Sequence, residues 1–381
     1  MKKKIMIVFG TRPEAIKMAP LVHALKSKAN IFNTKVCVTA QHREMLDQVL
    51  KLFKIKPDVD LDLMTKKQDL FATTSSILMS MQKVFAKYLP DIVLVHGDTT
   101  TTFATSLASF YAGIQIGHVE AGLRTHNLLA PFPEEFNRQV VSKLARWNFA
   151  PTELCKKNLL KEGVPRKKII ITGNTIIDSL NCILLRIKSN YHFRHNLISK
   201  LKKILPFDFQ KQRFILVTCH RRENFGIGLL NIYSAIKDLA NHYKKIHFVY
   251  PVHMNPHLQK PIKNILTNIK NIHLIEPQTY EVFIYLLKEC YAVLTDSGGV
   301  QEEAPNLGKP VLVMRDVTER PEAFISNSIS LVGVDQKRIF TYASRLLEDH
   351  SFYKKMSSVR NPFGDGNACK RIVEVLSSEE L

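Results

Sequence analysis

Short runs of β-branched and other apolar residues alternate along this chain with longer segments that have the 3.6-residue period of amphipathic helices. The pattern predicts a first series of strands at residues 5–9, 35–39, 92–96, 114–119 and 169–172. It then starts again, with strands expected at 214–218, 247–251, 273–275, 292–295 and 310–314. Strands that alternate with helices form parallel sheets through right-handed crossovers. The sequence therefore predicts an α/β protein with two parallel sheets.

The two series of strands are separated by residues 174–205, which have helical periodicity and no strand pattern. We place a domain boundary there, with an N-terminal domain at 1–173 and a C-terminal domain at 174–360. Both are expected to be Rossmann-like, doubly wound domains. A last amphipathic helix within residues 361–381 is expected to pack back on the first domain.

The charge of the chain invites a nucleic-acid interpretation. It carries 54 Lys and Arg residues against 34 Asp and Glu, a formal net charge of +20. However, the lysines are spread in pairs such as 156–157, 202–203 and 244–245, without a dense basic tail or interleaved aromatic residues. We interpret the excess as a solvated surface whose field attracts a dianionic substrate, and we expect no nucleic-acid partner.

Cysteine and hydropathy patterns restrict the class of protein further. The six cysteines are scattered and contain no C-x-x-C pair, which favours neither a zinc site nor a disulfide framework. No apolar run approaches the length that crosses a membrane. We therefore expect a cytoplasmic protein with no membrane partner. His253 and His257 have the spacing of a metal pair, but Pro256 between them opposes a continuous helix, so no metal is predicted.

Ligands of open parallel sheets bind beyond the carboxyl ends of the strands. The first predicted strand leads into Gly10-Thr11-Arg12-Pro13-Glu14, where Arg12 and Lys17 would reach an anion at the start of the next helix. The alternative is a capped helix with solvated cations. Neither a G-x-G-x-x-G after a strand nor a Walker A sequence occurs. This argues against NAD-dependent and NTP-hydrolysing activities, and no cofactor is predicted.

A glycine-rich turn, Asp296-Ser297-Gly298-Gly299, follows the predicted strand 292–295 and precedes a helix expected at 300–307. Glycines let the backbone approach a diphosphate, and the helix start supplies N–H groups. Glu303 lies four residues beyond Gly299, on the same helical face, where it would accept both hydroxyls of a ribose. The alternative is a tight turn with a solvated glutamate.

Three carboxylates occupy comparable places in the first half: Asp98, Glu120 and Glu134. Asp98 alone is also a good candidate for a helix cap. Three acids that face one crevice indicate acid–base chemistry, because crowded carboxylates raise one another's pKa. In the second half His220 follows a strand, where it would bind a leaving phosphate. The alternative for His220 is a structural role.

At these residues the chain resembles, nearly end to end, the bacterial non-hydrolysing UDP-N-acetylglucosamine 2-epimerases. The matching blocks are 10–15, 41–45, 96–99, 117–122, 296–303 and 318–322. The resemblance implies a fold similar to GT-B glycosyltransferases, with two Rossmann-like domains facing a central cleft. It implies catalytic roles for Asp98, Glu120, Glu134 and His220. It also implies contacts to UDP or substrate from Arg12, Lys17, Gln278, Phe283, Ser297, Gly298, Gly299, Glu303 and Arg320.

The reaction implied by the resemblance is reversible epimerisation at C2 of UDP-N-acetylglucosamine to UDP-N-acetylmannosamine. UDP is eliminated to leave 2-acetamidoglucal and then adds back, a route that needs no NAD. The product would supply envelope polysaccharide biosynthesis. The family also implies a homodimer and activation through a second UDP-N-acetylglucosamine site.

Three alternatives stay open at this point. The first is a hydrolysing 2-epimerase that releases UDP and N-acetylmannosamine. The second is a retaining GT-B glycosyltransferase, and the third is a non-enzymatic sensor of UDP sugars. The set of three carboxylates argues against the second and the third.

Overall fold

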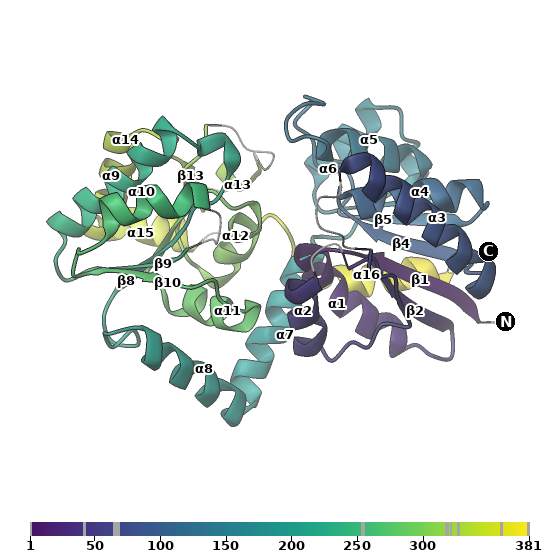
Figure 1. The fold of residues 1–381 in the computed structure, drawn as a ribbon, viewed down its shortest axis with the longest axis horizontal. Coiled ribbons are helices and arrows are strands. Elements are labelled where there is room, and N and C mark those ends of the chain that lie inside the picture. Colours follow the sequence, from purple (N-terminus) through teal and green to yellow (C-terminus); the bar gives the residue numbers. More distant parts are fainter. Residues whose placement is uncertain are drawn as a thin grey trace. The chain divides into compact units, whose positions relative to one another are not determined.

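The computed structural model describes residues 2–40, 43–63, 69–252, 256–316, 320, 322–325, 328–358 and 361–378. The chain divides into two compact units, residues 1–182 with 363–381, and residues 183–362 (Figure 1). Each unit holds one parallel sheet with helices, so the predicted fold class of two Rossmann-like α/β domains is confirmed. The division falls after Cys182 and not at residue 173, and Ser179 already donates a hydrogen bond to Ile16 O (2.6 Å) in the first unit.

The first unit contains a seven-stranded parallel sheet in the order β3-β2-β1-β4-β5-β6-β7. Its strands are β1 (Lys3–Phe9), β2 (Phe32–Val38), β3 (Val59–Asp60), β4 (Ile92–His96), β5 (Gln115–Val119), β6 (Trp147–Ala150) and β7 (Ile169–Ile171). The central strands β1 and β4 are almost entirely buried, as sheets covered on both faces require. The apolar pattern did not predict β3 or β6, because β3 has two residues and β6 has no β-branched residue.

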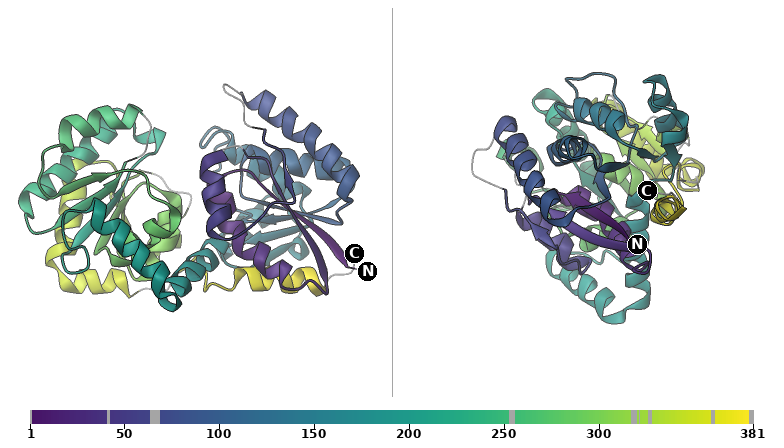
Figure 2. Two further views of the ribbon diagram at one scale, coloured as in Figure 1. Left: turned by 60° about the horizontal axis from the view of Figure 1, so that its bottom comes forward. Right: turned by 90° about the vertical axis from the view of Figure 1, so that its right-hand side faces the viewer.

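The helices of the first unit cover this sheet. They are α1 (Arg12–Lys26), α2 (Arg43–Leu52), α3 (Leu70–Tyr88), α4 (Thr100–Tyr111), α5 (Glu134–Leu144), α6 (Glu153–Lys161), the start of α7 (Thr175–Ser189) and α16 (Ala368–Ser378). Figure 2 shows α16, in yellow, alongside α1, in purple. Lys3 Nζ also donates to Leu376 O (2.8 Å), so the last helix of the chain belongs to the first unit.

The second unit contains a six-stranded parallel sheet in the order β10-β9-β8-β11-β12-β13. Its strands are β8 (Phe214–Thr218), β9 (His247–Pro251), β10 (Ile272–Ile275), β11 (Ala292–Thr295), β12 (Val311–Val313) and β13 (Ile329–Leu331), of which β13 was not predicted. Its helices are α8 (Tyr191–Ile204), α9 (Ile227–His242), α10 (Pro256–Leu266), α11 (Tyr280–Glu289), α12 (Gly298–Glu303), α13 (Glu322–Ile325), α14 (Gln336–Glu348) and α15 (His350–Ser357).

The helix predicted at 300–307 is shorter than expected. The α-helix α12 ends at Glu303, and a 3-10 turn follows at Ala304–Leu307. Pro305 lies within that turn, and its missing N–H interrupts the α-helical hydrogen bonds.

Each sheet has one point where the direction of strand addition reverses. In the first unit it lies between β1 and β4, and in the second between β8 and β11. In open parallel sheets a ligand-binding crevice is expected at this point, at the carboxyl ends of the strands. The chain after β1 is packed so closely that a Cβ on Gly10 would lie 2.1 Å from Thr39 Oγ1 and 2.5 Å from Thr101 Oγ1. Only glycine fits there, which brings the backbone of the next residues to the crevice.

Candidate active site

Asp98 follows β4 in the first unit and is held by two residues of α5. The Arg138 guanidinium donates a hydrogen bond to its carboxylate, and Asn137 Nδ2 donates to its backbone oxygen (2.9 Å). The cap of α4 is Thr99, whose hydroxyl accepts from Thr102 N (3.1 Å). The alternative role for Asp98 as a helix cap is therefore wrong, and its partly exposed carboxylate is left with Arg138 as an ionic partner.

Glu120 follows the neighbouring strand β5. Its φ of 65° lies in the left-handed region, which costs a residue with a side chain about 1–2 kcal/mol. Its carboxylate contacts the ammonium of Lys17 and accepts from Asn174 Nδ2 (2.8 Å). Its Oε1 lies 3.7 Å from the place where a Cβ on Gly97 would stand. The strained backbone thus places the Glu120 carboxylate beside Gly97, in the turn that carries Asp98.

Glu134 is the first residue of α5, and its neighbour Glu135 has a different environment. Glu134 Oε2 is buried and accepts no hydrogen bond from the residues that the structure describes. Glu135 is fully buried and accepts from Thr125 N (3.1 Å), His126 N (3.2 Å) and Gln139 Nε2 (2.9 Å). Of the two, Glu134 has the carboxylate available for proton exchange.

Two histidines lie beside these acids. His96 Nε2 is 3.7 Å from Glu120 Oε2, and burial, with a further contribution from the Lys17 charge, lowers the pKa of His96 to about 4. His118 Nε2 lies 2.7 Å from Gly97 O, and burial lowers the pKa of His118 to about 3. Because a carbonyl only accepts, Nε2 of His118 carries the proton. Both rings are neutral near pH 7 and support the 97–98 turn and Glu120 without adding charge.

Arg12 is the first residue of α1, where the helix dipole favours an anion. Lys17 lies on the same helix, and its ammonium contacts Glu120. The sequence predicted that Arg12 and Lys17 bind one anion. In the structure Lys17 instead contacts Glu120, a candidate catalytic acid.

In the second unit His220 follows β8 and is held by Asp296, which follows β11. The fully buried Asp296 carboxylate accepts from His220 N (2.9 Å), Arg221 N (2.8 Å) and Asn224 Nδ2 (3.2 Å). His220 Nδ1 also lies 3.4 Å from Asp296 Oδ1. The imidazole itself is well exposed, so Asp296 fixes a ring that a ligand can reach.

The turn Ser297-Gly298-Gly299 leads from Asp296 into α12. A Cβ on Gly298 would lie 2.7 Å from Arg320 Nη1, so the missing side chain makes room for that guanidinium. Arg320 Nε donates to Glu302 Oε1 (2.7 Å). A Cβ on Gly299 would meet nothing within 4 Å. The turn thus packs against the buried Arg320 guanidinium at Gly298 and leaves space for a side chain at Gly299.

The remaining predicted binding residues lie around α11. Glu303 is buried and accepts from Tyr280 OH (2.7 Å). Phe283 is on α11, half-buried, and Gln278 precedes that helix and donates to Glu276 O (2.7 Å). Glu303 therefore has a hydrogen-bonding partner in this unit and is not the solvated glutamate of the alternative interpretation.

Sequence reasoning missed three residues that organise these groups: Glu14, Arg138 and Asp296. Glu14 completes the T-x-x-E signature of a capping box with Thr11, a signal that was available. Arg138 lies one turn beyond Glu134 on α5, a spacing that places both on one helical face. Asp296 directly follows β11, as Glu120 follows β5, and Asp98 comes two residues after β4.

Parts of the quoted motifs lie outside the described residues: 41–42, 253–255, 317–319 and 321. The metal pair considered at His253 and His257 is among them, since His253 and the side chain of His257 are not described. Within the described ranges, no cluster of three His, Cys, Asp or Glu side chains is arranged to hold a metal ion. In the same ranges, every helix is too short or too polar to cross a bilayer.

Comparison with known proteins identifies the family. The family model for UDP-N-acetylglucosamine 2-epimerase matches residues 23–377. The UDP-N-acetylglucosamine 2-epimerase of Escherichia coli (strain K12) is 53% identical over 378 residues, with 99% of both chains covered. The solved structure of UDP-GlcNAc 2-epimerase from Neisseria meningitidis bound to UDP-GlcNAc superposes with a TM-score of 0.93 at 50% identity, covering 99% of this chain and 100% of that one.

A more distant solved structure extends the same result. UDP-GlcNAc 2-epimerase from Methanocaldococcus jannaschii, in complex with UDP-GlcNAc and UDP, has a TM-score of 0.83 at 33% identity and covers 99% of this chain and 100% of that one. The resemblance that the sequence motifs indicated is confirmed by these matches. The chain belongs to the UDP-N-acetylglucosamine 2-epimerase family.

Proposed function

We propose that this protein interconverts UDP-N-acetylglucosamine and UDP-N-acetylmannosamine without hydrolysing either. The observation that carries the proposal is the arrangement at the strand ends of the first unit. There Asp98 and Glu120 follow adjacent parallel strands, each with a cationic partner, and Glu134 starts the helix that also supplies Arg138. Proton transfer to and from a sugar carbon needs such a set of positioned acids.

The chemistry explains why the sugar nucleotide itself is the substrate. The C2 proton of the sugar is not adjacent to a carbonyl, so a base cannot remove it without assistance. When the C1–O bond to UDP breaks, the positive character at C1 acidifies the C2–H bond. A carboxylate takes that proton, and 2-acetamidoglucal and UDP stay bound. Proton delivery to the other face of C2 and re-addition of UDP at C1 complete the inversion.

The two units divide this work in the proposal. In the second, the Ser297–Gly299 turn, Arg320 and His220 bind the diphosphate and stabilise its charge as it leaves. Glu303 and Tyr280, already hydrogen-bonded to each other, bind the nucleoside side of UDP. In the first unit, Arg12 adds a positive charge, and Asp98, Glu120 and Glu134 share proton removal and proton delivery.

The proposal includes the context of the reaction. A cytoplasmic location fits the scattered cysteines, which form no disulfide pattern. The product would enter the synthesis of envelope polysaccharides, whose assembly uses activated sugars of this kind.

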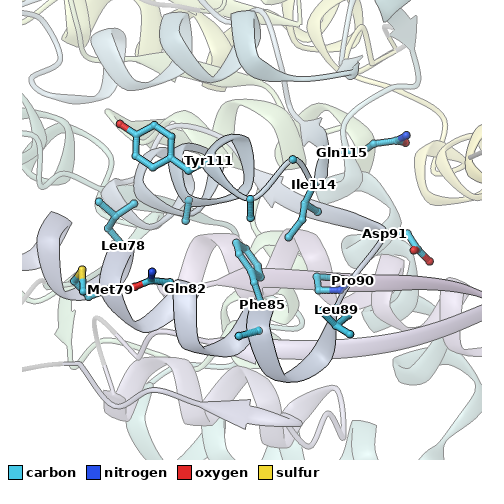
Figure 3. Close-up of a pocket in the computed structure, with 14 residues that line it drawn as sticks. Leu78, Met79, Gln82, Phe85, Leu89, Pro90, Asp91, Tyr111, Ile114 and Gln115 are labelled. Atoms are coloured by element: carbon cyan, nitrogen blue, oxygen red, sulfur yellow. The ribbon is translucent and has the colours of Figure 1, made fainter.

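We also propose that the chain forms a homodimer through the outer face of α3 and α4. This face exposes apolar side chains in the first unit, among them Met79 (56% exposed), Leu89 (63%) and Tyr111 (71%). They surround a groove of about 740 Å³, with Phe85 and Ile114 in its lining (Figure 3). Exposed apolar surface of this extent marks an interaction site. Sedimentation of a monomer at tens of micromolar would contradict the dimer.

One experiment tests the activity directly. Purified protein is incubated with UDP-N-acetylglucosamine in D2O, without added NAD or metal, and the products are followed by proton NMR. The expected result is UDP-N-acetylmannosamine with deuterium at C2. Free N-acetylmannosamine with an equal amount of UDP would establish a hydrolysing epimerase, and the absence of any C2 exchange would refute epimerisation.

A further inference from the structure

Glu14 is a buried carboxylate, 2% exposed, that connects two separate loops of the first unit. Its Oε2 accepts hydrogen bonds from Gly10 N (3.0 Å), Thr11 N (2.8 Å) and Thr11 Oγ1 (2.8 Å). Its Oε1 accepts from Thr99 Oγ1 (2.7 Å) and lies 3.2 Å from Thr102 Oγ1, a hydroxyl that also has a shorter bond to His96 O (2.6 Å). One oxygen therefore binds the loop after β1, and the other binds the start of α4 after β4.

These two loops carry candidate residues for the reaction. Arg12 follows Thr11 directly, and Asp98 precedes Thr99 directly. The helices α1 and α4 lie on opposite faces of the sheet, because β1 and β4 are the strands between which the sheet order reverses and their crossovers are right-handed. Glu14 forms hydrogen bonds to both loops and so links the loop of Arg12 directly to the start of α4 next to Asp98.

The second unit also has a buried carboxylate that bonds two strand-end loops, and there the residue is Asp296. Asp296 follows β11 and accepts from His220 N, Arg221 N and Asn224 Nδ2, all in the segment after β8. β8 and β11 hold the same places in their sheet as β1 and β4 hold in theirs. In both units a buried carboxylate thus bonds the two loops at the reversal point, although the sequence positions of the two carboxylates differ: one precedes its helix, and the other lies inside it.

We propose that Glu14 is a positioning residue for the epimerase reaction, one that acts by holding Arg12 and Asp98 in a fixed relation. The inference rests on the proposed function. The N–H groups of Gly10 and Thr11 donate to Glu14 from one loop and the Thr99 hydroxyl donates from the other, so the carboxylate accepts on both sides. A 1 Å displacement of a catalytic group is enough to lower a rate about 100-fold.

Substitutions at Glu14 can separate this role from simple stabilisation. Glu14→Ala removes both connections. Glu14→Gln retains them, because the amide oxygen can accept from the N–H groups of Gly10 and Thr11. Its NH2 group can donate to the hydroxyls of Thr99 and Thr102, which accept as well as donate.

A matched control exists in the same unit. Asp178, on α7, is also a buried carboxylate and accepts from Ala368 N (3.3 Å) and Cys369 N (3.0 Å) at the start of α16. Burial raises the pKa of Asp178, as it does the pKa of Glu14. Asp178→Ala therefore removes a comparable buried acceptor that lies at none of the strand ends of the candidate site.

The experiment measures Tm, kcat and KM for UDP-N-acetylglucosamine, and C2 deuteration, in the full-length wild type and the three variants. We expect Glu14→Ala to lower kcat/KM about 100-fold with a raised KM, because the loop of Arg12 loses its hydrogen bond to the start of α4 next to Asp98. Glu14→Gln should recover most of that loss. Asp178→Ala should lower Tm to a similar degree but keep kcat/KM within about threefold of wild type, since it leaves the strand-end loops intact.

The contrary outcomes are distinct. Equal relative losses of kcat/KM in Glu14→Ala and Asp178→Ala, with KM unchanged in both, would reduce Glu14 to a stabilising residue and overturn the proposal. So would full activity in Glu14→Ala. A wild type that shows no C2 exchange would refute the proposed function, and the role of Glu14 in it would fall too.

Discussion

The guanidinium of Arg138 donates a hydrogen bond to the carboxylate of Asp98 from a position one helical turn beyond Glu134. The helix α5 therefore supplies one candidate acid and holds another. Both Arg138 and Asn137 are buried, and together they bind the side chain and the backbone of Asp98. Few rotamers of Asp98 are compatible with both contacts.

Replacement of Arg138 should lower the rate of the reaction. Arg138→Met removes the guanidinium that holds the carboxylate of Asp98, so kcat/KM should fall about 100-fold as that carboxylate loses its fixed position. Arg138→Lys should recover part of the rate, because it restores a positive charge without the planar fork.

The control for this prediction is a second buried arginine. Arg124 donates to Glu162 through Nε (2.7 Å) and Nη2 (2.9 Å). None of its hydrogen bonds in the described part of the chain is to Asp98. Arg124→Met should lower the free energy of unfolding by about 3–5 kcal/mol, the usual cost of breaking a buried pair. The kcat/KM of the folded enzyme should stay within about threefold of wild type, because the contacts of Asp98 are intact. An undiminished kcat/KM in Arg138→Met would count against the role given to Arg138.

The adjacent residues Glu134 and Glu135 should give opposite results when each is changed to glutamine. Glu134→Gln should lower kcat at least about 100-fold with little change in Tm, since a positioned acid or base contributes that much and its Oε2 has no donor to lose. Burial by itself raises the pKa of Glu135. Hydrogen bonds from Gln139 and Thr125, together with the Arg138 charge, outweigh burial and hold this pKa below its ordinary value. Glu135→Gln should therefore lower Tm and spare kcat. Steady-state kinetics and thermal unfolding of both variants test this prediction. A lower Tm in Glu134→Gln and a lower kcat in Glu135→Gln would make Glu135 the reacting acid and Glu134 the structural one.

Neighbouring glycines of the 297–299 turn should respond differently to alanine. Gly298→Ala places a Cβ 2.7 Å from Arg320 Nη1, so it should displace that guanidinium and lower stability by about 1–3 kcal/mol. Gly299→Ala meets nothing within 4 Å and should leave stability nearly unchanged. It should weaken UDP binding about tenfold or more if the diphosphate lies against this backbone. Calorimetric titration with UDP measures the affinity of both variants. An undiminished affinity in Gly299→Ala would mean that the diphosphate does not lie against this backbone.

His118 should make the stability of the first unit depend on pH. Its pKa is about 3 in the folded chain because of burial, and about 6.5 when unfolded. The unfolded state therefore binds more protons between these values. The stability from this group is complete above pH 6.5 and is lost as the pH falls toward 3, by about 1.4 kcal/mol per pH unit.

Urea unfolding between pH 4 and 6 measures that slope. His118→Asn should reduce it by about 1.4 kcal/mol per pH unit, whereas the exposed His350→Asn should leave it unchanged. The slope is compared and not the absolute stability, because the loss of a buried ring lowers stability at every pH. Equal slopes in the wild type and His118→Asn would mean that His118 titrates alike in both states.

The periodicity of apolar residues was enough to predict two parallel α/β domains and most of their strands. Burial on both faces demands continuous apolar runs, and such runs can be seen in the sequence. Strands β3, β6 and β13 were not predicted, because β3 has two residues, β6 has no β-branched residue, and β13 is a three-residue strand at the edge of its sheet. The division after Cys182 also depends on contacts, since one continuous helix, α7, crosses it.

The candidate acids Asp98 and Glu120 could be proposed from the sequence because each follows a strand, and parallel strands bring their carboxyl ends to one edge. Which partner each acid has was decided by the tertiary structure alone. Lys17 lies 103 residues from Glu120, and Glu14 lies 85 residues from Thr99, separations at which no local pattern links them. The sequence alone thus determined the residue types and their place at the strand ends. The fold determined their pairing, because hydrogen bonds and desolvation act between side chains that only the packed sheet and helices bring together.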